Sequence, residues 1–198
     1  MDLHTLLREL EQFGSDNDDS HTERGERMLN ITRDTGELLA VLVKARAARH
    51  ILEIGTSNGY STLWLAQATA PLGGLVTTVE FSDFKFDLAK ANFARSGLGG
   101  AIRALRADAG QVLAQAADGA YEMVFLDAER SAYLAWWPQI RRVLAAGGML
   151  VVDNAVSHQA EMAAFTAAVG ADAAFTSCLA PVGKGEFIAV KAPAAAPA

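Results

Sequence analysis

Short apolar runs alternate with amphipathic segments between residues 50 and 170, and this alternation constrains the fold more than any other feature. The apolar runs cover residues 51–55, 75–80, 101–105, 123–127 and 149–153. Segments with helical periodicity lie between and after them, at 60–70, 83–96, 108–116, 131–145 and 158–169. Strands that are apolar along their whole length are typical of a parallel sheet covered by helices on both faces. The pattern therefore predicts a doubly wound, Rossmann-like α/β fold.

The two ends of the chain depart from this rhythm. Leucines at positions 3, 6, 7 and 10 have helical spacing, residues 14–20 read as a polar break, and a second helix is predicted over 33–46. Near the other end, two β-prone runs flank Gly183-Lys184-Gly185, which predicts a β-hairpin that closes the sheet with an antiparallel pair. Cys178 lies on the first of these runs, where we expect it to be buried.

These elements predict a single domain over residues 1–198. We expect N-terminal helices in 1–47, an α/β core in 48–191 and a frayed Ala/Pro tail in 192–198. The Leu-rich stripe of the first helix needs a partner surface, either in this chain or in a second subunit.

Charge and composition exclude several classes of protein. The 198 residues include 17 Lys and Arg against 23 Asp and Glu, a formal net charge of -6. An acidic chain without a basic cluster is not expected to bind nucleic acid, and no apolar run approaches the roughly 18 residues of a membrane span. The single Cys excludes a framework of disulfides within the chain. We therefore expect a cytoplasmic protein with no nucleic-acid or membrane partner.

The loop after the first strand is the most informative stretch. Gly55 and Gly59 permit a tight turn and a close approach of ligand to backbone, and Glu53 is costly to bury unless it binds something. Glu80 ends the second strand, where a carboxylate can accept the hydroxyls of a ribose. The Gly-x-Gly-x-x-Gly fingerprint is absent, which disfavours a nicotinamide dehydrogenase. The alternative is a strand-to-helix loop that holds no ligand.

Oxygen-bearing side chains follow the fourth and fifth strands. Asp127 ends one strand, and Asp153 with Asn154 ends the next. Ligands of open α/β sheets bind at the carboxyl ends of strands, so these three side chains are expected to converge. Two carboxylates and an amide oxygen suit Mg²⁺ better than zinc. The alternative is that both Asp side chains only accept hydrogen bonds from loop amides.

With these residues placed, the chain resembles the cation-dependent O-methyltransferases that include the caffeoyl-CoA and catechol enzymes. The resemblance covers roughly residues 28–191 and is carried by the segments 52–61, 78–80, 125–128 and 147–154. It implies a seven-stranded sheet with the last strand reversed, S-adenosylmethionine as methyl donor, and a homodimer.

The resemblance also implies roles for individual residues. The donor pocket would be formed by Leu29, Ile31, Glu53, Gly55, Ser57, Gly59, Ser61, Glu80, Phe81, Asp108, Ala109 and Asp127. The cation ligands would be Asp127, Asp153 and Asn154, with Mg²⁺ as the expected ion and Ca²⁺ or Mn²⁺ as alternatives. Asp127 and Arg130 are the expected catalytic residues.

Arg130 is a departure from the family pattern. The family usually has Lys at this position, where it is read as the general base, but Arg keeps its proton in proteins. We therefore expect Arg130 to act as an electrostatic partner of the substrate, and the alternative is a solvated charge at the start of a helix. The predicted function is methyl transfer from S-adenosylmethionine to a hydroxyl of a small catechol-like aromatic molecule, assisted by a divalent cation. The alternatives are a metal-independent methyltransferase for another small acceptor, and a non-catalytic module that binds S-adenosylmethionine.

Overall fold

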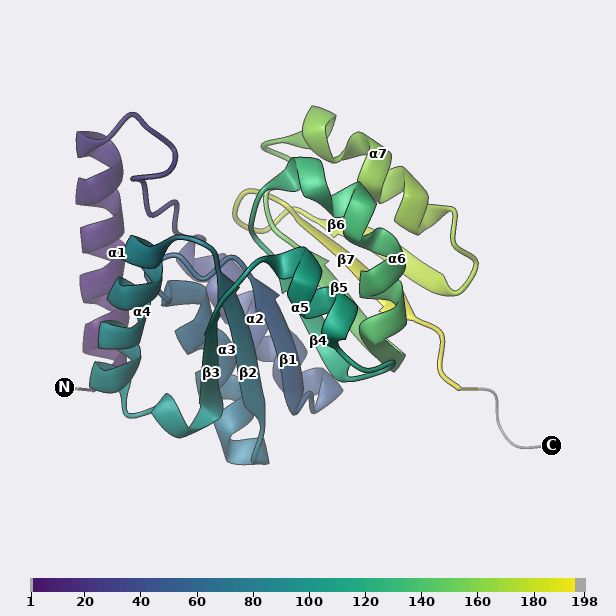
Figure 1. Ribbon diagram of the computed structural model, residues 1–198, viewed down its shortest axis with the longest axis horizontal. Helices are drawn as coiled ribbons and strands as arrows, with labels where there is room; N and C mark the ends of the chain where they lie inside the picture. The colour runs from purple at the N-terminus through teal and green to yellow at the C-terminus, as the bar shows by residue number, and fades with distance from the viewer. Residues whose placement is uncertain (1, 195–198) are drawn as a thin grey trace.

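The computed structural model describes residues 2–194, and in this range the strands form one seven-stranded sheet (Figure 1). The spatial order is β3-β2-β1-β4-β5-β7-β6. The strands are β1 His50–Ile54, β2 Leu75–Glu80, β3 Ile102–Arg106, β4 Tyr121–Leu126, β5 Leu144–Val152, β6 Phe175–Ala180 and β7 Glu186–Lys191. Strands β1 to β5 pair in parallel, whereas β7 is antiparallel to both β5 and β6. The predicted fold class and the closing hairpin are confirmed.

Helices cover both faces of this sheet (Figure 1). They are α1 Leu3–Ser20, α2 Arg33–Arg46, α3 Tyr60–Thr69, α4 Asp83–Ser96, α5 Ala109–Gln115, α6 Tyr133–Val143 and α7 Gln159–Gly170, with short 3₁₀ turns η1 Ala70–Leu72, η2 Gly99–Ala101 and η3 Arg130–Ala132. Helices α1 to α4 contribute to one hydrophobic core, and α5 to α7 contribute to the other.

Alternate residues of each central strand enter opposite cores. Ile51 and Phe125 are packed with the α1–α4 layer, and Leu52 and Val124 are packed with the α5–α7 layer. Because successive side chains of a strand point to opposite faces, a sheet buried on both sides needs apolar residues at every position. This explains why the strands read as continuous apolar runs.

The boundary between α6 and β5 and the exposure of Cys178 differ from the predictions. Strand β5 begins at Leu144, before the Gly147-Gly148 pair, so the helix ends earlier and the strand starts earlier than the sequence pattern indicates. Cys178 is exposed, because β6 is an edge strand whose central residues face solvent. The expectation that this thiol is buried is therefore wrong.

The predicted break at residues 14–20 is also wrong, because α1 continues to Ser20. Gly14 is buried, and a Cβ there would lie 2.4 Å from the side-chain nitrogen of Asn30. Asp18 accepts hydrogen bonds from the backbone N–H groups of Met28 and Leu29, at 2.6 and 2.9 Å. The polar residues at the end of α1 thus bind the segment that precedes α2. Local sequence patterns do not report such contacts.

The apolar stripe of α1 is buried within the chain. Leu6 and Leu7 are fully buried in the α1–α4 core, and Leu10 is almost so. The stripe therefore needs no second subunit, and the homodimer stays a prediction that gel filtration at several concentrations would test. In residues 2–194, none of the helices combines the length and apolar character that a membrane crossing requires. Residues 195–198 of the predicted frayed tail lie outside the described part of the chain.

Candidate active site

The carboxyl ends of β1, β4 and β5 form the floor of the candidate site. The backbone ladder continues one step past these strands, since Asp127 N–H donates to the Ile54 carbonyl at 2.9 Å and Asp153 N–H donates to the Leu126 carbonyl at 3.1 Å. These bonds place Asp127 between the ends of β1 and β5. The predicted convergence of the strand ends is therefore present in the backbone itself.

Gly55 makes this close approach of the strand ends possible. Its φ is +101°, and a Cβ at this position would lie 2.1 Å from the carbonyl oxygen of Asp127. Any side chain would therefore both strain the backbone and collide with the β4 end. Gly59 has a related role, because its φ is +89° and a Cβ there would meet the ring of Phe93 at 2.5 Å.

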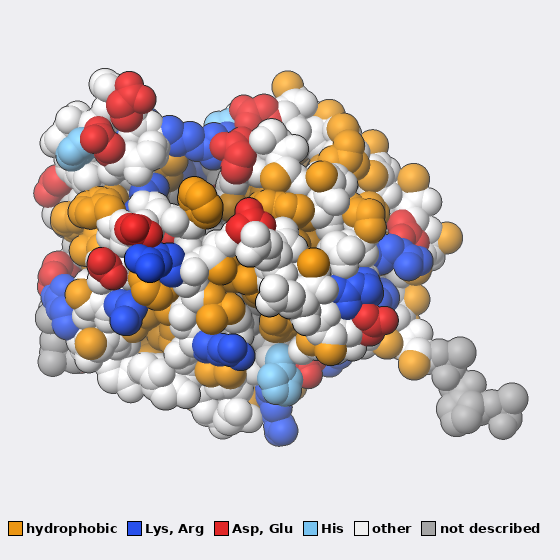
Figure 2. Space-filling view, in the orientation of Figure 1, with side chains coloured by type: hydrophobic (Ala, Val, Ile, Leu, Met, Phe, Trp, Pro, Cys, Tyr) orange, Lys and Arg blue, Asp and Glu red, His pale blue; other side chains and the backbone are white. Residues whose placement is uncertain are grey.

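A cavity of about 1050 Å³ opens above these strand ends. Figure 2 shows the surface hollowed between the segment that follows α1 and the α6–α7 side of the molecule, with Lys, Arg and His side chains along the edge of the hollow. The predicted donor residues in its wall are Leu29, Ile31, Gly55, Ser57, Ser61, Glu80, Phe81, Asp108, Ala109 and Asp127. Glu53 and Gly59 lie behind the wall and do not line the cavity.

Glu80 is held by the loops on both sides of it. One carboxylate oxygen accepts the N–H groups of Thr56 and Ser57, at 3.2 and 2.8 Å, and the other accepts those of Phe81 and Ser82, at 3.0 and 2.9 Å. Four donors fill the acceptor capacity of a carboxylate. The hydroxyls of a ribose bound here would therefore have to replace some of these backbone N–H donors. The side chain is thereby fixed at the edge of the cavity.

Glu53 supports the first loop from behind the cavity wall. It is fully buried, and its carboxylate accepts hydrogen bonds from Ser61, Thr62 and Thr78, the first and last at 2.6 Å. Burial raises the pKa of Glu53 to about 7, against the opposing effect of these hydroxyl donors. Glu53 therefore orients Ser61, which does line the cavity, and fixes the start of α3 against the sheet.

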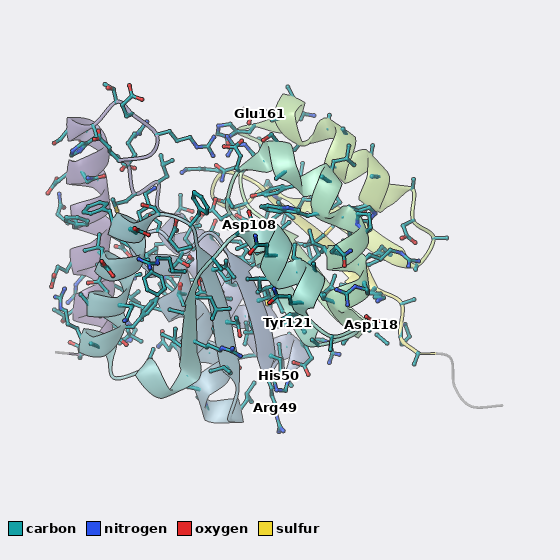
Figure 3. All side chains as sticks on the ribbon, viewed as in Figure 1. Arg49, His50, Asp108, Asp118, Tyr121 and Glu161 are labelled. Carbon is teal, nitrogen blue, oxygen red and sulfur yellow. The ribbon has the colours of Figure 1, made fainter. Side chains whose placement is uncertain are left out.

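Asp108 lies on the α5 side of the cavity. Figure 3 shows it between the end of β3 and α5, in the middle of the molecule. Its side chain caps α5 by accepting the N–H of Gln111 at 2.9 Å. His50 and Tyr121, labelled in the same figure, lie at the opposite, amino end of the sheet and are remote from the cavity. The cavity thus uses only one edge of the sheet.

The three candidate cation ligands are in direct contact. The Asn154 amide donates to Asp127 at 3.1 Å and to Asp153 at 2.9 Å. Removal from water raises the pKa of Asp127, and the negative charge of Asp153 raises it further. The second oxygen of Asp153 is buried beside the carboxyl group of Glu186, which is itself buried, and burial together with the nearby charge of Asp153 raises the pKa of Glu186. Asn154 has the left-handed backbone φ of +68°, and backbone strain beside clustered buried carboxyl groups is typical of a functional centre.

The donor set fits a hard divalent cation with one rearrangement. In residues 2–194 no group of three or more His, Cys, Asp or Glu side chains is placed to hold a metal ion, so the candidate set needs the amide oxygen of Asn154. That oxygen accepts a hydrogen bond from Ser157 at 3.3 Å, while the amide nitrogen faces the carboxylates. Rotation of the amide would turn its oxygen toward Asp127 and Asp153 and would give three oxygen ligands.

Arg130 reaches the cavity from the turn after β4. It is 8% exposed, and its Nε donates to Glu161 at 2.8 Å. Figure 3 shows Glu161 at the start of α7, at the rim of the site. Among the described residues no partner for the two Nη groups is seen, so they remain available to a ligand in the cavity.

Several residues in the wall were not predicted. They are Arg24, Arg27, Met28, Lys85, Trp136 and Lys184 among others. Trp136 carried a weak signal as an aromatic residue near the metal-binding strand, whereas Arg27 and Lys184 belong to no motif. They reach the cavity through the segment before α2 and the β6–β7 turn, which lie far apart in the sequence. A single sequence contains no periodicity that reports such contacts.

The doubly wound sheet, with a large cavity at the carboxyl ends of its central strands, defines a class of α/β proteins that bind nucleotide-like ligands at this edge. A profile of the O-methyltransferase family matches residues 1–191. The chain belongs to this O-methyltransferase family, which confirms the family resemblance.

Two relatives of similar sequence are named catechol O-methyltransferases. A catechol O-methyltransferase of Mycobacterium tuberculosis (strain ATCC 25618 / H37Rv) is 32% identical over 126 residues, which are 64% of this chain and 57% of that protein. A catechol O-methyltransferase of Niastella koreensis is 30% identical over 140 residues, 69% of this chain and 63% of the relative. The chain thus spans about three fifths of the length of these two proteins.

Solved structures share the fold. An O-methyltransferase from Bacillus cereus, in complex with SAH, superposes with a TM-score of 0.79 at 25% identity, over 94% of this chain and 90% of that chain. A putative caffeoyl-CoA O-methyltransferase from Staphylococcus aureus gives a TM-score of 0.81 at 21% identity, over 93% and 91% of the two chains. The second likeness shows the fold alone.

Proposed function

We propose that this chain transfers a methyl group from S-adenosylmethionine to a hydroxyl of a small catechol-like molecule, assisted by a divalent cation. The observation that carries this proposal is that Asn154 contacts both Asp127 and Asp153, with Asn154 and Asp127 lining a cavity that Glu80 and Asp108 also line and Asp153 directly behind them. One wall suits a nucleoside, and the other offers oxygen ligands for a cation. The family membership, the catechol-named relatives and the SAH complex of a solved structure support this reading.

The reaction is a displacement at carbon. The acceptor oxygen forms a bond to the methyl carbon, the carbon–sulfur bond breaks, and its electron pair stays on sulfur to give S-adenosylhomocysteine. A divalent cation bound to vicinal hydroxyls would orient them and lower their pKa. The chain itself aligns the two reactants, and such alignment alone can supply several kcal/mol.

Arg130 contributes charge and does not accept the proton. Because arginine side chains in proteins do not act as bases, Arg130 stabilises the phenolate through its positive charge, and the hydroxyl proton leaves to a solvent base. In this scheme Arg130 occupies the position of the family's Lys but performs only its electrostatic part.

Chelation tests the cation. We expect methylation of a neutral catechol to be lost in excess EDTA and restored by Mg²⁺. We expect Asp153→Asn to lower kcat/KM by about a hundredfold or more, since removing a ligand disrupts the site. Asp87→Asn, at an exposed position on α4, is the matched control and keeps wild-type activity. Full activity in EDTA would remove the cation from the mechanism.

The role of Arg130 is tested by its pH dependence. We expect Arg130→Gln to lower kcat roughly tenfold to a hundredfold, because the charge is lost. Arg130→Lys should retain most activity near pH 7 but lose it as pH rises toward the usual lysine pKa of about 10.4. A rate that instead rises with pH in the lysine variant would show that this position works as a base.

A metal-independent methyltransferase is the second candidate. The orientation of the Asn154 amide, which presents its nitrogen to both carboxylates, favours it, because these contacts stabilise the carboxylates without a cation. Methylation that survives EDTA and Asp153→Asn would establish this reading. Binding of S-adenosylhomocysteine without methylation of any acceptor would favour a non-catalytic module.

A further inference from the structure

We propose that Arg27 and Lys184 bind a carboxylate on the methyl acceptor, so that the preferred acceptor is a catechol carrying an acidic group. This inference rests on the proposed function and names its substrate class. Both residues line the cavity, one from the segment before α2 and the other from the β6–β7 turn.

The charges in the cavity wall do not balance. Its acidic residues are Glu80, Asp108, Asp127 and Glu129, and its Lys and Arg residues are Arg24, Arg27, Lys85, Arg130 and Lys184. This cationic excess stands in a chain whose formal net charge is -6. The excess is one charge, which Asp153 behind Asn154 offsets, so the binding of an anionic ligand depends on which individual cations lack an ion-pair partner.

The acidic residues of the wall are already engaged. Glu80 accepts four backbone N–H groups, and Asp108 caps α5. Glu129 pairs with Arg24 at 3.5 Å, and Asp127 belongs to the candidate cation site. None of the four is therefore free to neutralise a further cation.

Arg27 and Lys184 form no salt bridge among the described residues, although Lys184 interacts electrostatically with Asp127. The Nε of Arg27 is buried without any hydrogen-bond partner. The Nζ of Lys184 donates a hydrogen bond to the carbonyl oxygen of Asn30, at 3.5 Å. Asn30 lies three residues after Arg27, so this contact brings the β6–β7 turn to the same segment of chain.

The other cations are assigned to other parts of the site. Arg130 is held by Glu161 and is assigned to the reacting hydroxyl, and Lys85 interacts electrostatically with Glu80, the expected ribose ligand, whereas Lys184 interacts with Asp127 beside the acceptor. An acceptor carboxylate would give the buried Arg27 N–H the partner that it lacks, and it would receive a second charge from Lys184. Hydrogen bonds between charged groups in such partly enclosed places are among the strongest that proteins make.

The donor has a carboxylate of its own, which is the competing occupant for these cations. Ser61 and the loop around Gly55 also line the cavity and offer hydroxyl and amide donors to that group, and Ser57 of this loop donates to the carbonyl oxygen of Met28, next to Arg27. The test must therefore separate binding of the acceptor from binding of the donor.

The experiment compares protocatechuate with its uncharged amide, which keeps the same ring and hydroxyls. Full-length protein is saturated with S-adenosylhomocysteine and Mg²⁺ and titrated with each compound in a calorimeter, and kcat/KM is measured for both with S-adenosylmethionine. We expect the acid to bind about tenfold or more tightly than the amide and to be methylated with a similar advantage.

The variants are Arg27→Gln and Lys184→Gln, with Lys44→Gln on the exposed face of α2 as the matched control. Each of the first two should reduce the advantage of the acid to about threefold or less, whereas the control should keep it. Two variants on different segments keep the test valid if one fails to fold.

Two results would overturn the inference of a carboxylate site, and a third would overturn the proposed methyl-transfer function alone. Equal binding of acid and amide would remove the carboxylate site. Variants that weaken S-adenosylhomocysteine and leave the acid preference intact would assign the cations to the donor and so overturn the inference as well. Selective binding of the acid without methylation of either compound would keep the carboxylate site and reject the proposed function.

Discussion

At the scale of residues, Glu53 shows how a buried charge supports a site that it does not touch. Its carboxylate has no access to solvent and depends on three hydroxyl donors, yet burial still raises its pKa to about 7. The hydroxyls reduce the cost of burying the charged form without removing it. Ser61, one of these donors, is thereby fixed at the cavity wall.

This raised pKa predicts a pH-dependent stability. The folded protein holds the Glu53 proton up to about pH 7, whereas the ordinary value is 4.5, so the folded state binds more protons between these limits. The contribution of Glu53 to the free energy of unfolding is therefore complete below about pH 4.5 and is lost as pH rises through 7. Glu53→Gln should remove this dependence, worth about 3 kcal/mol at most.

Urea unfolding at pH 5 and pH 8 measures this effect. The fall in stability between the two values should be smaller in Glu53→Gln than in the wild-type protein. Glu37→Gln, at an exposed position on α2, serves as the control and should follow the wild type. An unchanged fall in Glu53→Gln would mean that its carboxyl titrates normally in the folded state.

At the scale of elements, the last turns of α1 determine the shape of the cavity entrance. The helix continues through a polar stretch because Asp18 has a structural task, which is to accept the N–H groups of Met28 and Leu29. Both residues line the cavity, so the C-terminal end of α1 positions one of its walls.

Asp18→Ala tests this arrangement. Loss of two hydrogen bonds to a charged acceptor should lower the free energy of unfolding by about 1–3 kcal/mol and weaken binding of S-adenosylhomocysteine. Asp19→Ala, the exposed neighbour, should change stability by about 0.5 kcal/mol or less. Calorimetric titration and urea unfolding of both variants provide the comparison. Identical behaviour of the two would show that the segment before α2 is held by other contacts.

At the scale of the whole molecule, the cavity joins the two halves of the sheet. Glu80 comes from the β3-β2-β1 half, and Asn154 and Lys184 come from the β4-β5-β7-β6 half. A ligand that contacts both halves binds the folded chain and not the unfolded one, and it therefore stabilises the entire fold by mass action.

S-adenosylhomocysteine should accordingly raise the melting temperature. At about 100 times its Kd the expected gain is about 2.7 kcal/mol, which is roughly 5–10 °C for a chain of this size. NAD at the same concentration should give no shift, because the dinucleotide fingerprint is missing from the first loop. Differential scanning calorimetry measures both. A larger increase in melting temperature with NAD than with S-adenosylhomocysteine would favour a nicotinamide dehydrogenase instead.

The fold and the floor of the site could be predicted from the sequence, and the walls could not. Strands buried on both faces must be apolar throughout, and parallel strands bring their carboxyl ends to one edge, so the positions of Glu80, Asp127 and Asp153 followed from local pattern. Only the tertiary structure decided that Glu53 lies behind the cavity wall and that Arg27 and Lys184 lie in it. The physical reason is that periodicity reports the direction of a side chain relative to its own element, whereas a wall made by separate loops depends on packing between distant parts of the chain.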